Sequence, residues 1–130
     1  MKSELSPFTV YTIRRAQDLD RCAKRGTGEF TEHKRWVGAL GLLDQAKRAG
    51  TRLPIIFADA GNTTDTLMYY GFISNLDVSR NTTTYRFTEL RPIGSKRQKS
   101  SLVLRSTGKA LSDDFIRNLA YVHTPAYIRA

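Results

Sequence analysis

LPIIFA, from Leu53 to Ala58, is a continuous apolar run of strand length, and it is the stretch that decides the fold. A run this apolar is typical of a strand that is buried on both faces. Downstream, GFISNLDV (Gly71 to Val78) predicts a second strand and Arg80-Asn81 a hairpin turn. TYRFT (Thr84 to Thr88) alternates so that its two aromatic rings share one face, which predicts a half-buried strand.

Upstream of this run, the sequence predicts one strand and two helices. TVYTIR (Thr9 to Arg14) is dense in β-branched and aromatic residues and predicts a first strand. Gln17 to Arg25 predicts a short helix. A longer helix is predicted from Thr31, as its N-cap, to Ala49, where Gly50 follows as its terminating residue. From Trp36 onward its apolar residues recur at helical spacing and so share one face.

The remaining segments predict four further elements. Asn62 or Thr63 is expected to cap a short helix that continues through Tyr70 and is broken by Gly71. Ser101 to Arg105 predicts a strand, and Ser112 is expected to cap a short helix. Ala120 to Ile128 is expected to return to the sheet as an edge strand, because it contains a proline. Together these elements predict an α+β fold: a small, curled, mostly antiparallel β-barrel with two or three flanking helices.

Composition narrows the class of protein. The chain has 130 residues, which predicts a single domain over residues 1–130, and 40% of them are hydrophobic. No apolar run approaches the length of about twenty residues that a bilayer requires, and the N-terminus does not have the pattern of a secretory signal. Cys22 is the only cysteine, so an intrachain disulfide and a zinc site of several thiolates are excluded. A cytoplasmic, reducing setting such as the bacterial interior is expected.

The charge is concentrated in one segment. The chain carries 21 basic and 12 acidic residues, and RPIGSKRQKSSLVLRSTGK (Arg91 to Lys109) contains basic residues and no acidic one. One interpretation is a solvated loop. The other is a surface for a polyanion, because clustered cations release condensed counterions when they meet phosphates. The apolar triplet Leu102 to Leu104 favours the second, since it should anchor the segment to a core.

Basic residues from two distant parts of the sequence are expected to form the walls of a phosphate-binding groove. Arginine suits bidentate phosphate contacts, whereas lysine acts as a point charge. The alternative is a generally basic exterior with no defined face. The predicted phosphate-binding residues are Arg14, Arg15, Arg91, Lys96, Arg97 and Lys99.

From Pro54 onward the order of elements, with the pieces YYGFI and ELRPI, resembles the PUA-like superfamily of small β-barrels, especially its EVE- and ASCH-type branches. The resemblance covers about Pro54 to Arg129. It implies a barrel whose mouth accepts a base or a nucleic-acid strand, often a modified base. The ASCH signature and the tryptophan-containing N-terminal signature of EVE domains are not found, so only the architecture and the general role are carried over.

A base pocket is predicted at the ends of the central elements. Asp59 follows the buried strand, where its carboxylate would accept hydrogen bonds from a base, or would close a turn before Asn62. Tyr69 and Tyr70 offer ring faces for stacking a base, or they pack in the core. Trp36 has the same two interpretations, stacking on a flipped base or anchoring the core.

The sequence offers weaker support for a catalytic function than for binding. Lys24, Thr27 and Glu29 bring together the residue types of ASCH-type hydrolases, but they also suit a surface turn. His33 and His123 have no neighbouring ligand types, so no metal is assigned, and no cofactor is expected.

The sequence therefore predicts a non-catalytic nucleic-acid-binding module for DNA or RNA, acting alone or beside a separately encoded nuclease or modifying enzyme. Two alternatives stay open. One is a small hydrolase of RNA or a nucleoside that uses the 24–29 segment. The other is a protein-interaction adaptor whose basic loop meets an acidic partner.

Overall fold

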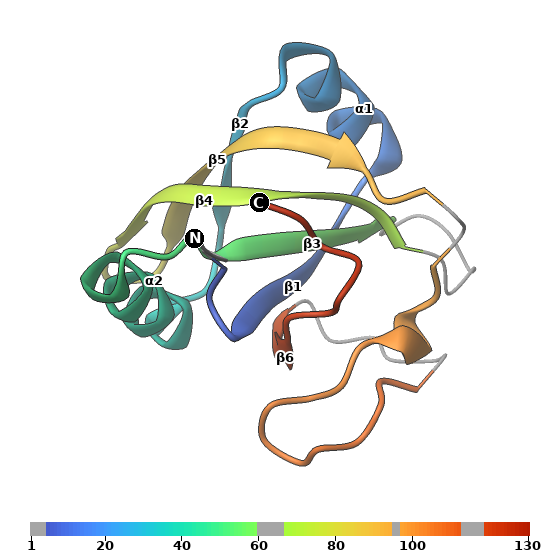
Figure 1. Cartoon of the computed structure of the whole chain (residues 1–130). Coiled ribbons are helices and arrows are strands. Elements are labelled where there is room, and N and C mark those ends of the chain that lie inside the picture. Colours follow the sequence, from blue (N-terminus) through green and yellow to red (C-terminus); the bar gives the residue numbers. More distant parts are fainter. Residues whose placement is uncertain (1–4, 60–66, 95–96, 113–118) are drawn as a thin grey trace.

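A computed structural model describes residues 5–59, 67–94, 97–112 and 119–130, and in these residues six strands form one mixed sheet (Figure 1). The strand order is β2-β5-β4-β3-β1-β6. The strands are β1 (Phe8–Arg14), β2 (Gly28–Glu32), β3 (Pro54–Asp59), β4 (Leu67–Val78), β5 (Thr83–Pro92) and β6 (Leu119–His123). The helical elements are α1 (Ala16–Arg25), α2 (Val37–Ala49) and the single 3-10 turn η1 (Lys99–Ser101). The predicted α+β class is confirmed.

β1 and β3 are the parallel pair, with Val10 opposite Ile55, and the other neighbouring strands are antiparallel. Parallel neighbours need a long crossover. Residues 15–53, which include α1, β2 and α2, form this crossover. The predicted strand at Leu53 to Ala58 is confirmed as β3, and it lies between β1 and β4.

The predicted barrel is not confirmed, because the sheet is not closed: β2 and β6 are its two edges in the described part of the chain. The sheet nevertheless curls strongly. The ring of Phe30 on β2 lies 6.2 Å from the ring of Phe57 on β3, although β5 and β4 separate these strands. Side chains of β2 and β3 therefore meet across the concave face of the sheet, although no backbone hydrogen bonds join the two edge strands that the structure describes.

Each face of the sheet has its own core, which explains why β3 is apolar from Pro54 to Ala58. Ile55 and Phe57 pack on one face against residues of α1 and α2. Ile56 and Ala58 point to the other face, where buried Leu102 and residues of the C-terminal tail cover them. The alternation of a strand places successive side chains on opposite faces, and both faces here are covered.

One of the two helix predictions needs correction at its boundary. α1 confirms the short helix predicted from Gln17, but α2 begins at Val37 and not at Thr31. Residues 28–32 instead form β2, in which Thr31 pairs with Thr84 of β5. Pairing along β5 satisfies the backbone of this segment better than an isolated extra helical turn would.

Predictions around β4 and in the C-terminal third had mixed outcomes. The helix expected through Tyr70 is wrong for Leu67–Tyr70, which begin β4 and pair with β3; residues 60–66 lie outside the described part. The hairpin turn is confirmed by a 2.9 Å hydrogen bond from Ser79 N–H to Thr82 O. Residues 101–105 form only isolated bridges at 103 and 104, not a full strand. The helix expected after Ser112 falls on residues 113–118, outside the described part. The edge strand predicted from Ala120 to Ile128 is confirmed as β6 only as far as His123, and residues 124–128 are not part of a strand.

Candidate nucleic-acid interface

Trp36, predicted to stack on a base or to anchor the core, lies in the core. It is 1% exposed, and its ring stacks on that of Tyr85 with centroids 4.6 Å apart and planes 18° apart. Its backbone N–H donates a 2.8 Å hydrogen bond to the hydroxyl of Thr83. One ring face is therefore occupied by a neighbouring aromatic side chain, as in a core anchor.

Tyr69 and Tyr70 point to opposite faces of the sheet, so they do not line one pocket together. Tyr69 packs at the face covered by α1, and its hydroxyl donates a 2.5 Å hydrogen bond to Asp20 of that helix. This hydrogen bond, together with burial and the charge of the carboxylate, raises the pKa of Tyr69 to about 12. Tyr70 is buried on the other face beside Phe72.

Asp59 acts at the beginning of a helix. Its Oδ1 accepts a 3.2 Å hydrogen bond from the backbone N–H of Ala16, the first residue of α1. The first N–H groups of a helix have no partner within the helix, so a carboxylate here stabilises it. Asn62, the end of the turn considered for Asp59, lies outside the described residues.

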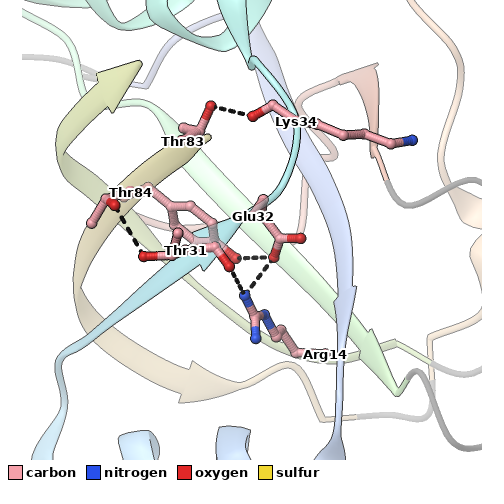
Figure 2. A network of polar contacts seen from close by, with 7 residues as sticks. Arg14, Thr31, Glu32, Lys34, Thr83 and Thr84 are labelled. Carbon is pink, nitrogen blue, oxygen red and sulfur yellow. Dashed lines mark hydrogen bonds and ion pairs between the residues drawn. The ribbon is translucent and has the colours of Figure 1, made fainter. Parts of the chain in front are cut away.

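Arg14 is part of a polar network that fixes the fold (Figure 2). Its Nη2 donates hydrogen bonds to Glu32 Oε2 at 2.6 Å and to Thr31 O at 3.0 Å, and its guanidinium lies 4.1 Å from the centroid of the Phe30 ring. Burial alone would lower the pKa of Arg14, but the neighbouring Tyr85 and Glu32 raise it overall. Only 23% of this side chain is exposed, and its hydrogen bonds to Glu32 and Thr31 are made within the protein.

The same network continues to the beginning of α2. The hydroxyl of Thr83 donates a 2.7 Å hydrogen bond to the carbonyl of Lys34, and the hydroxyls of Thr31 and Thr84 lie 3.0 Å apart (Figure 2). Burial is the main cause of a raised pKa for Tyr85, whose hydroxyl lies 3.5 Å from Glu32 Oε2. These contacts join β1, β2 and β5 at one end of the curled sheet.

On the opposite face, three arginines lie over aromatic rings. The guanidinium carbon of Arg52 is 3.7 Å from the ring centroid of Phe72, and that of Arg91 is 5.3 Å from the centroid of Tyr70. The guanidinium carbon of Arg97 is 4.5 Å from the ring centroid of Tyr127. We call these three residues the arginine row. Arg91 and Arg97 belong to the predicted phosphate-binding set; sequence reasoning missed Arg52, since nothing in the sequence places it beside Phe72.

A β-bulge holds two arginines of the row together. Glu89 and Leu90 on β5 stand opposite the single residue Gly71 on β4. Glu89 adopts a φ of 56°, the one positive φ of a non-glycine residue in the described ranges, and its carboxylate accepts hydrogen bonds from Arg52 and, at 3.0 Å, from Arg91. A side chain at Gly71 would meet Thr88 O at 2.9 Å, so glycine permits this close approach.

The arginine row follows β4 from its first residue. Leu67 N–H donates a 2.8 Å hydrogen bond to Arg97 O. Further along the strand, Tyr70 pairs with Arg91, and the ring of Phe72 lies under Arg52. Residues 67 to 72 span about 17 Å at the rise of an antiparallel strand. Leu67 pairs with Ala58 of β3, and Ala58 pairs with Ile13 of β1. Arg97 therefore lies at the same end of the sheet as the C-terminal end of β1, which Arg15 follows.

The rest of the basic segment is exposed and anchored. Leu102 is fully buried and Leu111 nearly so, and the backbone N–H of Leu111 donates a 2.9 Å hydrogen bond to Leu102 O. Arg105 and Lys109 lie exposed between them, and Lys99 begins η1. Lys96 lies outside the described residues. The expected anchoring of this segment by its apolar residues is confirmed for Leu102.

The residues proposed for hydrolysis are only partly brought together. Thr27 and Glu29 line a cavity of about 370 Å³ together with Arg86, whose Nε lies 3.1 Å from the carboxylate of Glu29. Lys24 is exposed on α1 and does not line this cavity. The carboxylate of Glu29 is thus paired with the guanidinium of Arg86.

A larger cavity, of about 680 Å³, lies where α2 begins, at the edge strand β6 and the turn after Leu104. Its lining includes Gly38, Arg105, Ser106, Thr107 and Tyr121. None of the four predicted base-pocket residues lines either cavity. The sequence carried no signal for this site, because its three segments are far apart along the chain.

Two general properties complete the description. No described helix is long and apolar enough to cross a membrane. Within residues 5–59, 67–94, 97–112 and 119–130, no three His, Cys, Asp or Glu side chains gather closely enough to bind a metal ion.

Comparisons with known proteins leave the family open. No protein-family model matches the chain, and no curated protein matches it.

Proposed function

We propose that this protein is a nucleic-acid-binding module and that the arginine row is its phosphate-binding surface. The observation that carries the proposal is the arrangement of three arginines over aromatic rings. Arg52 and Arg91 lie over rings of β4, and Arg97, which lies over Tyr127, is hydrogen-bonded to the first residue of that strand. A net charge of +9 supports a polyanionic partner over a small neutral one.

The chemistry of stacked arginines supports phosphate contacts. A guanidinium has five N–H donors in its plane, so a ring below it leaves those donors directed sideways. Arg52 and Arg91 have 32% and 37% of their side chains exposed, which leaves part of each accessible to a ligand. Glu89 orients both groups and neutralises only one of the two charges. Held in this way, the arginines lose little side-chain freedom when they bind a phosphate oxygen.

The acid-free segment contributes further exposed cations. Arg105 and Lys109 follow Arg97 in a stretch without a carboxylate, so no side chain of this stretch competes with phosphates for them. For the architecture, we also propose a distant kinship with PUA-like proteins, on the basis of the curled sheet and the order of its strands; a closed barrel is not part of the proposal.

Salt dependence tests the proposal. The affinity for single-stranded and double-stranded oligonucleotides of DNA and RNA is measured by fluorescence anisotropy between about 50 and 200 mM salt. Three phosphate contacts give a slope of log affinity against log salt of about −2 for a single strand and about −3 for a duplex. A slope near zero, or binding to an acidic protein that nucleic acid does not displace, contradicts the proposal and favours the adaptor.

A further inference from the structure

The cavity of about 680 Å³ has a lining suited to an anion with an apolar part. Arg105, Ser106 and Thr107 supply one guanidinium and two hydroxyls to the lining, and none of the described lining residues is acidic. Leu104, Leu119 and Tyr121 supply the apolar wall. Cavities of this size and mixed character are typical of sites for small organic ligands.

An open strand edge also faces this region. The backbone N–H of Arg105 donates to Tyr121 O and that of His123 to Val103 O, both at 2.9 Å, so these β6 residues direct their backbone groups away from β1. Leu119 shares this orientation because alternate residues of a strand do so. After Arg105 the chain turns back, with a 2.9 Å hydrogen bond from Gly108 N–H to Leu104 O, and it does not follow β6 any further. Within the described residues, the backbone groups of Leu119 on this edge are therefore available to a ligand.

Two contacts fix the polar and aromatic walls. The guanidinium carbon of Arg105 lies 5.0 Å from the ring centroid of Phe8, which restrains its position. The hydroxyl of Tyr121 accepts a hydrogen bond from the backbone N–H of Ala39. The ring of Tyr121 lies so close to Gly38 that a Cβ there would meet its hydroxyl oxygen at 2.7 Å. The glycine thus sets the position of the aromatic wall.

We propose that this cavity binds one nucleotide unit of the nucleic acid, with the phosphate at Arg105 and the base against Leu104 and Tyr121. Ser106 and Thr107 supply hydroxyls for the phosphate or the sugar, and the β6 edge supplies hydrogen bonds to the edge of the base. This inference rests on the proposed function and adds a base-binding site to it, at a place other than the predicted base pocket.

Single nucleotides test the cavity separately from the arginine row. AMP, CMP, GMP and UMP are titrated into the 15N-labelled protein, with ribose 5-phosphate as the control that lacks a base. Amide shifts are expected at Gly38, at 105–107 and at 119–121, with tighter binding for at least one nucleotide than for ribose 5-phosphate. Arg105→Gln should weaken this binding about tenfold, the loss expected for a charge-assisted hydrogen bond. Lys109→Gln removes the same charge from a residue outside the lining, and it should change the affinity for the nucleotide by less than about twofold.

A pair of glycine variants tests the aromatic wall without changing charge. Gly38→Ala should displace the Tyr121 ring and weaken nucleotide binding, whereas Gly41→Ala, on the same helix, places its Cβ in open space and should not. Both variants are checked for folding by circular dichroism. If Gly38→Ala does not fold, the comparison of Arg105→Gln with Lys109→Gln still decides.

The outcomes separate the two proposals. Oligonucleotide binding with a steep salt slope, but no nucleotide shifts at the cavity, overturns the cavity site and leaves the arginine row standing. Equal losses for Arg105→Gln and Lys109→Gln also overturn it, because they indicate general charge attraction. Nucleotide binding at the cavity without salt-dependent oligonucleotide binding overturns the arginine row and the assignment of the cavity to a unit of nucleic acid, and it indicates a site for free nucleotides. If neither ligand binds, both proposals are wrong.

Discussion

The guanidinium of Arg14 on β1 bonds to the carboxylate of Glu32 on β2 at 2.6 Å, although three strands of the sheet separate β1 from β2. The contact crosses the concave face and is possible only because the sheet curls. Arg14 Nε is buried and has no hydrogen-bond partner in the described structure, so the guanidinium depends on Glu32 and Thr31 for its polar contacts.

Loss of this carboxylate should destabilise the fold. Glu32→Ala leaves a largely buried guanidinium without its counter-charge, and we expect the free energy of unfolding to fall by about 2 kcal/mol in chemical denaturation. Glu29→Ala is the matched control on the same strand, since its partner Arg86 is 63% exposed, and a change of no more than about 0.5 kcal/mol is expected. Equal effects of the two variants would show that the bridge across the sheet adds nothing.

The bulge at Glu89 should require glycine at position 71. In Gly71→Ala the new Cβ meets backbone and not a movable side chain, so strand β5 must shift, at a cost of about 1–3 kcal/mol. The unfolding midpoint in urea measures this cost. Gly41→Ala in α2 serves as the control and should stabilise the protein by about 0.5–1 kcal/mol. A neutral Gly71→Ala would contradict the close packing of the two strands.

Arginine-row variants should change the salt dependence of nucleic-acid binding. Arg52→Gln and Arg91→Gln are each expected to reduce the magnitude of the salt slope by about 0.7 for a single strand or 0.9 for a duplex. Lys47→Gln, in the last turn of α2, removes the same charge elsewhere and should leave the slope unchanged. If all three variants reduce the slope equally, the phosphates contact the protein without preference for this face.

The fluorescence of Trp36 should not respond to nucleic-acid binding. Because the ring is buried against Tyr85, its fluorescence should be blue-shifted from that of free tryptophan and protected from acrylamide. Saturating oligonucleotide should change neither property. Strong quenching by nucleic acid would revive the prediction that this ring stacks on a base.

The hydrogen bond to Asp20 should raise the pKa of Tyr69. Absorbance at alkaline pH should reveal its pKa near 12, and Asp20→Asn should bring that pKa down toward 10. Asp18→Asn, whose carboxylate faces Arg21, should leave it unchanged. Since the folded pKa lies above the unfolded one, the stabilisation is complete below about pH 10 and is lost as pH rises toward 12. A Tyr69 pKa that does not respond to Asp20→Asn would contradict the hydrogen bond.

Several elements could be predicted because their signals are local. The apolar run at β3, the alternation at Tyr85 and Phe87, and the helix α1 each follow from side-chain periodicity over a few residues. The boundary of α2 could not be predicted in this way, because Thr31 has the properties of a helix cap and loses that role only when β5 offers a pairing partner.

The candidate site was predictable in composition but not in position. From the residues alone it follows that the chain is strongly basic, that its cations cluster in a segment without acids, and that the apolar triplet Leu102 to Leu104 should anchor this segment. The burial of Trp36, the opposite orientations of Tyr69 and Tyr70, and the position of Arg52 over Phe72 become known only from the folded chain. Charge and hydrophobicity are properties of single residues, whereas a binding surface depends on strand register, the curl of the sheet and one bulge. These arise from contacts between residues far apart in the chain.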